Sequence, residues 1–187
     1  MEATESLKII EEMINRSRTK ISENGQLFLF WGWLTFFLSV AHYILLIHMQ
    51  LSWAPMVWFG SFIGFIYQII FLKNAKKKDN ATTFVDRSMS YIWSAFGVGM
   101  LFVMLAMPSL NYQPYPWFIL FYGMATFQSG SVLKFKPLIF GGIASWIIAL
   151  IAINVSLEYQ MLALSASLVC SYIIPGHLLK KNPISRV

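Results

Sequence analysis

The side chains that could do chemistry in this 187-residue chain are few and widely spaced. The histidines are His42, His48 and His177, and Cys170 is the only cysteine. His42 and His48 are six residues apart, so a helix would place them on different faces. A single cysteine allows neither an intrachain disulfide nor a cysteine-based metal site. We therefore predict no haem or metal centre and no cofactor.

The usual catalytic patterns are also missing from the sequence. It contains no GxSxG, no HExxH and no phosphate-binding glycine loop. No Asp, Glu, Lys or Arg lies in the central part of a long apolar segment, whereas proton-coupled pumps usually keep an ionisable residue at that depth. We therefore predict that the protein is not an enzyme, and that any energy from ATP comes from a partner.

One group of residues is suited to binding rather than to catalysis. The turn at 111–117 is aromatic and stiffened by two prolines, and an acidic residue begins the last apolar segment. If the first, fourth and sixth apolar segments converge, four side chains line one pocket: His42, Tyr115, Trp117 and Glu158. Aromatic walls with one carboxylate suit an amphipathic or cationic ligand. The alternative is a solvated glutamate beside a belt of rings at the outer membrane boundary: Trp53, Trp58, Tyr112, Tyr115 and Trp117.

Long apolar segments must position these residues. These segments predict six transmembrane helices. The chain is 57% hydrophobic and only 12% charged, whereas a soluble domain has about 25% charged residues. A helix needs about 20 apolar residues to cross a bilayer. Six segments fit: 27–49, 54–72, 89–107, 115–133, 137–153 and 159–179. We predict an all-α fold, with a compact six-helix transmembrane bundle over 26–180 and a basic tail at 181–187.

Rows of small residues indicate how these helices pack. Gly60 and Gly64 form a GxxxG pattern on the second segment. Further rows at four-residue spacing lie on the fifth and sixth segments: Gly141, Ser145 and Ala149, then Ala163, Ser167 and Ser171. Such rows let helix backbones approach closely in lipid, so they indicate a compact bundle.

The positions of the basic residues predict the orientation of the bundle. All 14 Lys and Arg fall in the two tails and in the turns after the second and fourth segments. Positive charge is retained on the cytoplasmic side, so both termini are predicted to be cytoplasmic. The net charge of +6 therefore reflects orientation, and we expect no nucleic-acid binding. We place the protein in a cell membrane, by default a bacterial inner membrane, because the chain and its turns are short.

Residues 1–25 predict a cytoplasmic amphipathic helix before the bundle. Leu7, Ile10 and Ile14 recur at helical spacing, and charged residues lie mostly on the other face. Two interpretations remain open: an elbow on the inner membrane surface, or a docking helix for a cytoplasmic protein or a second copy of the chain. Basic residues favour anionic lipid headgroups. We expect lipid or partner contacts at Leu7, Ile10, Ile14, Arg16, Arg18, Lys76, Lys77 and Lys78.

The architecture suggests two classes of function. In length and number of spans the chain is similar to the substrate-binding components of energy-coupling-factor vitamin transporters. An N-terminal elbow followed by six spans also looks like permease subunits of ABC exporters. The first span of the vitamin binders has alanines four apart, but here Ala41 stands alone, so the resemblance is architectural. It implies a membrane-embedded binding or transport subunit without its own energy source. The alternative is a regulator, sensor or assembly factor that docks a cytoplasmic partner through the N-terminal helix and the basic inner surface.

Overall fold

The computed structural model of the protein describes residues 25–78 and 84–181, and within these residues it is helical and has no strand. The first helix spans Gly25–His48 and ends in a π-helical turn, η1 (Ile44–His48). Next come the 3-10 helix η2 (Ala54–Gly60), α2 (Ser61–Lys78), α3 (Phe84–Leu105) and the 3-10 turn η3 (Met107–Leu110). The last elements are α4 (Tyr115–Val132), α5 (Lys136–Ala152), and a continuous rod of α6 (Leu157–Leu168), the π-helical turn η4 (Val169–Ile173) and α7 (Ile174–Lys181).

The six apolar segments predicted from the sequence each coincide with one of these helical rods. The largest shifts are at the second, which ends at Lys78 rather than at residue 72, and at the third, which begins at Phe84 rather than at residue 89. The amphipathic helix predicted over 1–25 lies, except for Gly25, outside the described residues. The contacts expected of Leu7, Ile10, Ile14, Arg16 and Arg18 therefore stay predictions.

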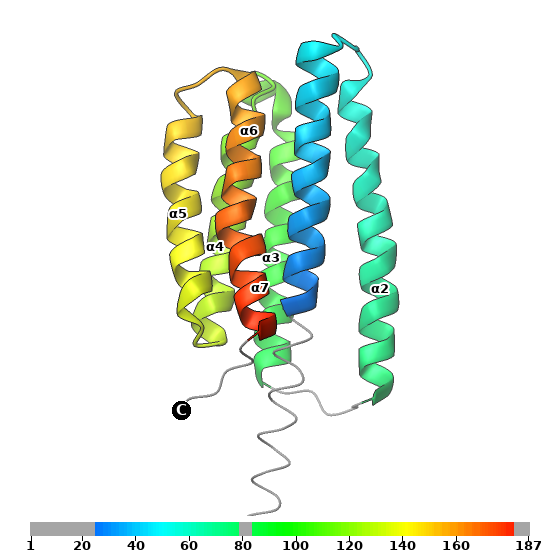
Figure 1. Ribbon diagram of the computed structural model, residues 1–187, viewed down its shortest axis with the longest axis vertical. Coiled ribbons are helices and arrows are strands. Elements are labelled where there is room, and N and C mark those ends of the chain that lie inside the picture. Colours follow the sequence, from blue (N-terminus) through cyan, green and yellow to red (C-terminus); the bar gives the residue numbers. More distant parts are fainter. Residues whose placement is uncertain (1–24, 79–83, 182–187) are drawn as a thin grey trace, which may run out of the picture.

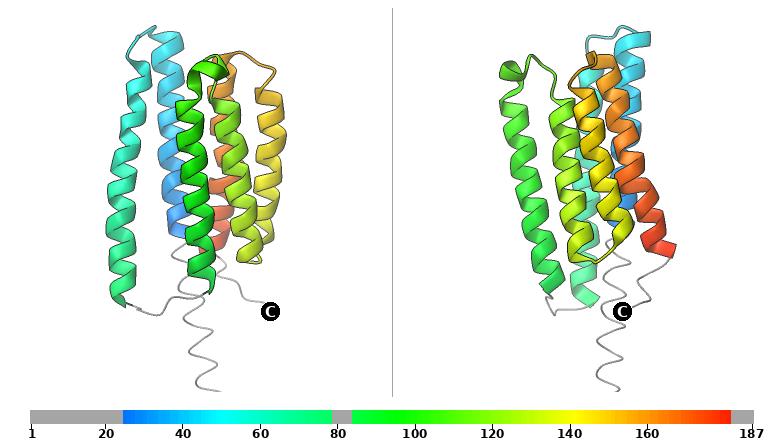
Figure 2. Two further views of the ribbon diagram at one scale, coloured as in Figure 1. Left: turned by 180° about the vertical axis from the view of Figure 1, so that it is seen from behind. Right: turned by 90° about the vertical axis from the view of Figure 1, so that its left-hand side faces the viewer.

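The rods stand side by side along the long axis of the molecule (Figure 1). α4 packs against α3, α5 and α6, while α2 and α3 lie at the edges of the bundle (Figure 2). The first helix lies against the α6–α7 rod, where a Cβ atom on Gly32 would be 2.8 Å from Cβ of Tyr172. The core thus lies between α4, the first helix and the α6–α7 rod, around Ile119, Leu164 and Leu168.

The GxxxG pattern of the second segment packs α2 onto the first helix. Cβ atoms on Gly60 and Gly64 would lie 2.8 and 2.6 Å from leucine side chains of the first helix, closer than real Cβ contacts allow. Near the same contact, Trp31 Nε1–H donates a hydrogen bond of 2.8 Å to Gln68 Oε1. The two glycines therefore leave room for side chains of the first helix, Leu38 at Gly60 and Leu34 at Gly64. The close approach of the two backbones stays a prediction.

Small residues also join α5 to the α6–α7 rod. A Cβ atom on Gly141 would lie 2.7 Å from the backbone oxygen of Cys170 and 2.8 Å from Cα of Ser171. Ser167 Oγ donates a hydrogen bond of 2.7 Å to Ser145 Oγ across the same interface. Small residues of the fifth and sixth segments therefore lie at a close contact between two helix backbones.

Four of the rods are long and apolar enough to span a membrane: Gly25–His48, Ala54–Asn74, Phe84–Leu105 and Leu157–Lys181. α5 is apolar but has 17 residues, and α4 has 18 but is not among the four. Although Gln128 and Ser131 are exposed, other polar side chains of α4 face neighbouring helices. Thr126 and Ser129 of α4, for example, are fully buried.

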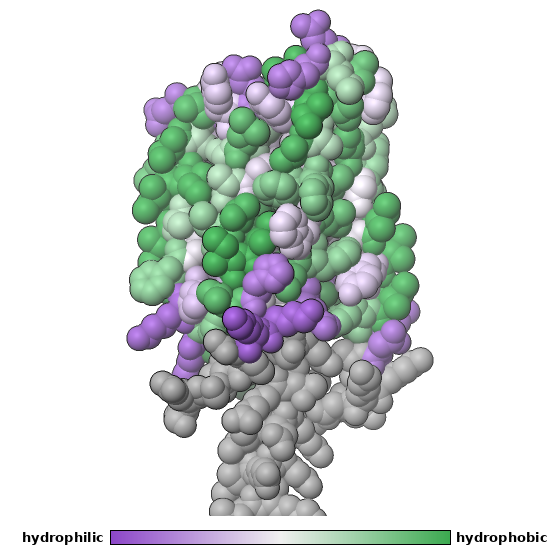
Figure 3. All heavy atoms as spheres, viewed as in Figure 1, coloured by the Kyte–Doolittle hydropathy of each residue, from purple (hydrophilic) through white to green (hydrophobic). Residues whose placement is uncertain are grey.

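The outer surface of the bundle is apolar along its middle. In Figure 3 hydrophobic residues cover the body of the visible face, and hydrophilic residues gather toward its two ends. Large side chains such as Ile63, Phe102 and Leu150 are 67–68% exposed. A soluble monomer rarely exposes so continuous an apolar surface. Together with the length of its helices, this surface indicates a membrane protein.

Candidate functional site

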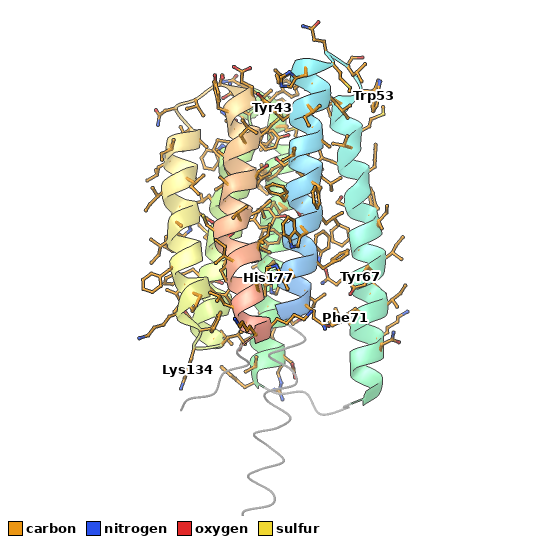
Figure 4. All side chains as sticks on the ribbon, in the orientation of Figure 1. Tyr43, Trp53, Tyr67, Phe71, Lys134 and His177 are labelled. Carbon is orange, nitrogen blue, oxygen red and sulfur yellow. The ribbon has the colours of Figure 1, made fainter. Side chains whose placement is uncertain are left out.

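The two ends of the bundle differ in charge. The end at the top of Figure 1, here called the upper end, is formed by the turns at 49–53, 106–114 and 153–156, which contain no Lys or Arg. Figure 4 shows Tyr43 and Trp53 at this end and Lys134 at the opposite, lower end. His177 lies toward the lower end, far from His42, the residue next to Tyr43.

A cluster of three polar aromatic side chains lies beneath the upper turns. Trp58 of η2 directs its Nε1–H to Nδ1 of His42 on the first helix, at 3.0 Å. The hydroxyl of Tyr115, the first residue of α4, lies 2.5 Å from the same nitrogen. His42 is 6% exposed and Tyr115 3%. We call these residues the His42 cluster, and it joins three separate rods.

The hydrogen bonds of the His42 cluster define the tautomer of the histidine. An indole N–H can only donate, so Nδ1 of His42 must accept and therefore has no proton. A neutral imidazole then has its proton on Nε2. Nε2 is buried and has no hydrogen-bond partner within the described parts of the chain. A buried donor without a partner costs about 1–3 kcal/mol, so this N–H is a strong binding group for an acceptor.

A second unpaired atom lies at the same end, on Gln160 in the first turn of α6. This residue is fully buried. Its Nε2 donates to Gln113 Oε1 at 2.9 Å and to the carbonyl of Val155 at 3.0 Å, which ties two upper turns together. Its Oε1 is buried and has no partner among the described residues. Among the residues that the structure describes, the upper turns thus lie near an unpaired donor on His42 and an unpaired acceptor on Gln160.

The first helix and α6 are joined just below these atoms. Ser39 Oγ donates a hydrogen bond of 2.8 Å to the backbone carbonyl of Met161, and both residues are fully buried. His42 is on the same face as Ser39, one helical turn nearer the upper end, and Gln160 precedes Met161. The π-helical turn η1 begins two residues after His42, and such turns often occur at functional sites.

The structure brings together two of the four side chains that the sequence suggested for one pocket, His42 and Tyr115. Trp117 is two residues after Tyr115 on α4 and is 40% exposed, whereas Tyr115 is buried. Glu158 is partly exposed and accepts a hydrogen bond of 3.2 Å from Ser156 Oγ. Neither is hydrogen-bonded to the His42 cluster in the structure.

Sequence reasoning missed Trp58 and Gln160. It placed Trp58 in a boundary belt, although its position beside Pro55 at the start of the second segment put it at the same depth as His42. The sequence places Gln160, one residue after Tyr159, only at the beginning of the last predicted span. A glutamine near the end of an apolar helix is a weak signal by itself. Only its burial and its bonds to two turns distinguish it.

The remaining predicted contact residues lie at the lower end. Lys76, Lys77 and Lys78 are the last residues of α2. Lys134 and Lys136 flank the turn between α4 and α5, and Lys180 and Lys181 end α7. Within residues 25–78 and 84–181, no three His, Cys, Asp or Glu side chains are grouped as metal ligands. No protein-family model, curated protein or solved structure matches the chain.

Proposed function

We propose that the protein is an integral membrane protein with six transmembrane helices and that both of its termini are cytoplasmic, in a bacterial inner membrane. This proposal is supported by four helices that are long and apolar enough to cross a membrane and by the apolar middle of the outer surface of the bundle. The basic residues at the lower end support it as well. α4 and α5 are each about 26 Å long at about 1.5 Å per residue, close to the roughly 30 Å hydrocarbon core. Their neighbours would shield them from lipid on several sides.

We propose further that it acts as a membrane-embedded binding or transport subunit without its own energy source. The observation that supports this most directly is the His42 cluster, in which a buried imidazole N–H has no partner among the described residues. Buried polar groups in native proteins are nearly always paired with protein, water or ligand. Trp58 and Tyr115 hold the ring by its other nitrogen, so the free N–H is pre-oriented for a bound molecule.

A non-transporting regulator is the second candidate, and the lower end supports it. The described Lys and Arg residues after the first helix all lie near this end: Lys73, Lys76, Lys77, Lys78, Arg87, Lys134, Lys136, Lys180 and Lys181. A basic surface of this kind suits an acidic cytoplasmic partner as well as anionic lipid. The predicted N-terminal helix would contribute to the same surface.

Native mass spectrometry of the protein, purified from its own membrane in mild detergent, distinguishes these functions. We expect a bound small molecule in the wild type and in Trp117→Phe, a change at an exposed aromatic residue. The same molecule should be lost in His42→Leu and reduced in Tyr115→Phe. If the wild type has no bound small molecule, the binding function is wrong. A stoichiometric protein partner, lost when residues 1–24 are deleted, would instead support the regulator.

A further inference from the structure

Two neighbouring elements bring lysines to the same border of the lower end. Lys134 and Lys136 flank the turn between α4 and α5, and Lys181 ends α7. α5 packs against the α6–α7 rod, where a Cβ atom on Gly141 would lie only 2.8 Å from Cα of Ser171. From this contact both helices continue side by side to the lower end (Figure 1). The lysines of the two elements therefore border one face of the bundle.

The depth of these lysines follows from the helical rise of about 1.5 Å per residue. Lys136 is five residues from Gly141, and Lys181 is ten residues from Ser171. The two lysines therefore lie about 7.5 and 15 Å below the contact between the helices. This difference is close to the thickness of one headgroup layer, about 5–8 Å, and long lysine side chains extend along an apolar surface toward such a layer. Both ammonium groups can thus lie among the same headgroups.

Toward the middle of the bundle the same face is apolar and open. Phe140 of α5 is 66% exposed, and Ile174 and Leu178 of α7 are 52% and 39% exposed. Lys136 and Phe140 are four residues apart, and Lys181 follows Leu178 by three residues and Ile174 by seven. On each helix the lysine therefore shares a face with exposed apolar side chains. Figure 3 shows hydrophobic residues over the body of this view and hydrophilic ones at its lower border.

The charge on this face has one sign. Residues 133–153 and 169–181 contain no Asp or Glu, and their four lysines are exposed: Lys134, Lys136, Lys180 and Lys181. A basic residue at a membrane surface attracts anionic lipid with about 1 kcal/mol. A zwitterionic headgroup has its own cation beside the phosphate and gains less from these lysines. The face thus combines an anion-binding border with an apolar surface of the kind that acyl chains cover.

We propose that this face binds one anionic phospholipid. Its phosphate lies between Lys136 and Lys181, and its acyl chains lie along Phe140, Ile174 and Leu178. An acidic protein would pair with the lysines but would leave the apolar side chains beside them to lipid. We call this surface the lipid face. The inference goes beyond the proposed binding function, and it rests on the proposed topology, in which α5 and α7 end in the same leaflet.

Native mass spectrometry with added lipids tests the lipid face. Phosphatidylglycerol and phosphatidylcholine with identical acyl chains are titrated into the purified full-length protein in mild detergent. We expect one saturable phosphatidylglycerol adduct in the wild type and weaker binding of phosphatidylcholine. The double variant Lys136→Gln/Lys181→Gln should weaken phosphatidylglycerol binding about thirtyfold, which corresponds to about 1 kcal/mol per lysine.

The matched control is Lys73→Gln/Arg87→Gln, which removes two positive charges from exposed positions on α2 and α3. This control should keep the saturable adduct. An equal loss in both double variants would indicate diffuse attraction to the whole lower end and would overturn the lipid face. Equal affinity of the wild type for the two lipids would also overturn it, and this comparison stands even if a variant does not fold. A copurifying acidic protein that is lost only in Lys136→Gln/Lys181→Gln would assign the surface to a protein instead.

Two further measurements separate this inference from the proposals on which the article's function rests. His42→Leu should keep the phosphatidylglycerol adduct, because the His42 cluster lies at the upper end. Extraction of the wild type from membranes by alkaline carbonate, which removes peripheral proteins, would refute the membrane topology. A protein that resists this extraction but does not prefer phosphatidylglycerol would refute only the lipid face.

Discussion

A methyl group added at Gly141 should destabilise the bundle, whereas the same change at Gly97 should not. At Gly141 the new Cβ would lie 2.7 Å from the backbone oxygen of Cys170 and 2.8 Å from Cα of Ser171. Backbone atoms of a packed helix cannot rotate away, so α5 and the α6–α7 rod must separate. At Gly97 on α3, a Cβ would meet nothing within 4 Å.

The size of the effect follows from two opposing terms. Replacing glycine by alanine inside a helix stabilises it by about 1 kcal/mol. Overpacking a close contact typically costs about 1–3 kcal/mol, and here the separation also lengthens the 2.7 Å bond between Ser167 and Ser145. Losing that buried bond adds about 1 kcal/mol. We expect Gly141→Ala to lower the free energy of unfolding by about 1–3 kcal/mol, and Gly97→Ala to leave it unchanged or raise it by up to about 1 kcal/mol.

Thermal unfolding in mild detergent, followed by helical circular dichroism, measures the difference between the two variants. Gly97→Ala is the matched control, because both changes add one methyl group to a helical glycine. We expect a lower Tm for Gly141→Ala alone. A Gly141→Ala variant as stable as Gly97→Ala would refute the close backbone contact between α5 and the α6–α7 rod.

Three further predictions concern the edge of the bundle, the site and the topology. Gly64→Leu should lower the Tm by separating α2 from the first helix, and an unchanged Tm would contradict their packing. Trp58→Phe removes the indole donor to His42 and should cost about 1–2 kcal/mol of stability, and a denaturation curve identical to the wild type would count against that bond. In a Cys170→Ser background, Asn111→Cys should react with a membrane-impermeant maleimide in intact cells, whereas Lys134→Cys should react only after permeabilisation. The opposite pattern would invert the proposed topology.

Much of the fold was predictable because it depends on local properties of the chain. Helices satisfy their backbone hydrogen bonds within one segment, so an apolar run of sufficient length predicts a helix without reference to the rest of the protein. The breaks between the runs are equally local, as with Pro116 at the start of α4. The rows of small residues indicated a compact bundle, and the structure shows that Gly141 leaves room for a neighbouring backbone.

The site was predictable only in part because its members come from different rods. The sequence by itself determined the helical segments, the uncharged character of their central parts and the depth of His42 and Tyr115. It did not determine which face of each helix meets which neighbour, because apolar residues surround these helices on all sides and leave no single stripe to mark the core. Only the tertiary structure decided that Tyr115 lies against His42 while Trp117 is exposed, and that Trp58 joins the cluster while Glu158 does not. Such choices depend on contacts between residues far apart in the chain, which no local pattern encodes.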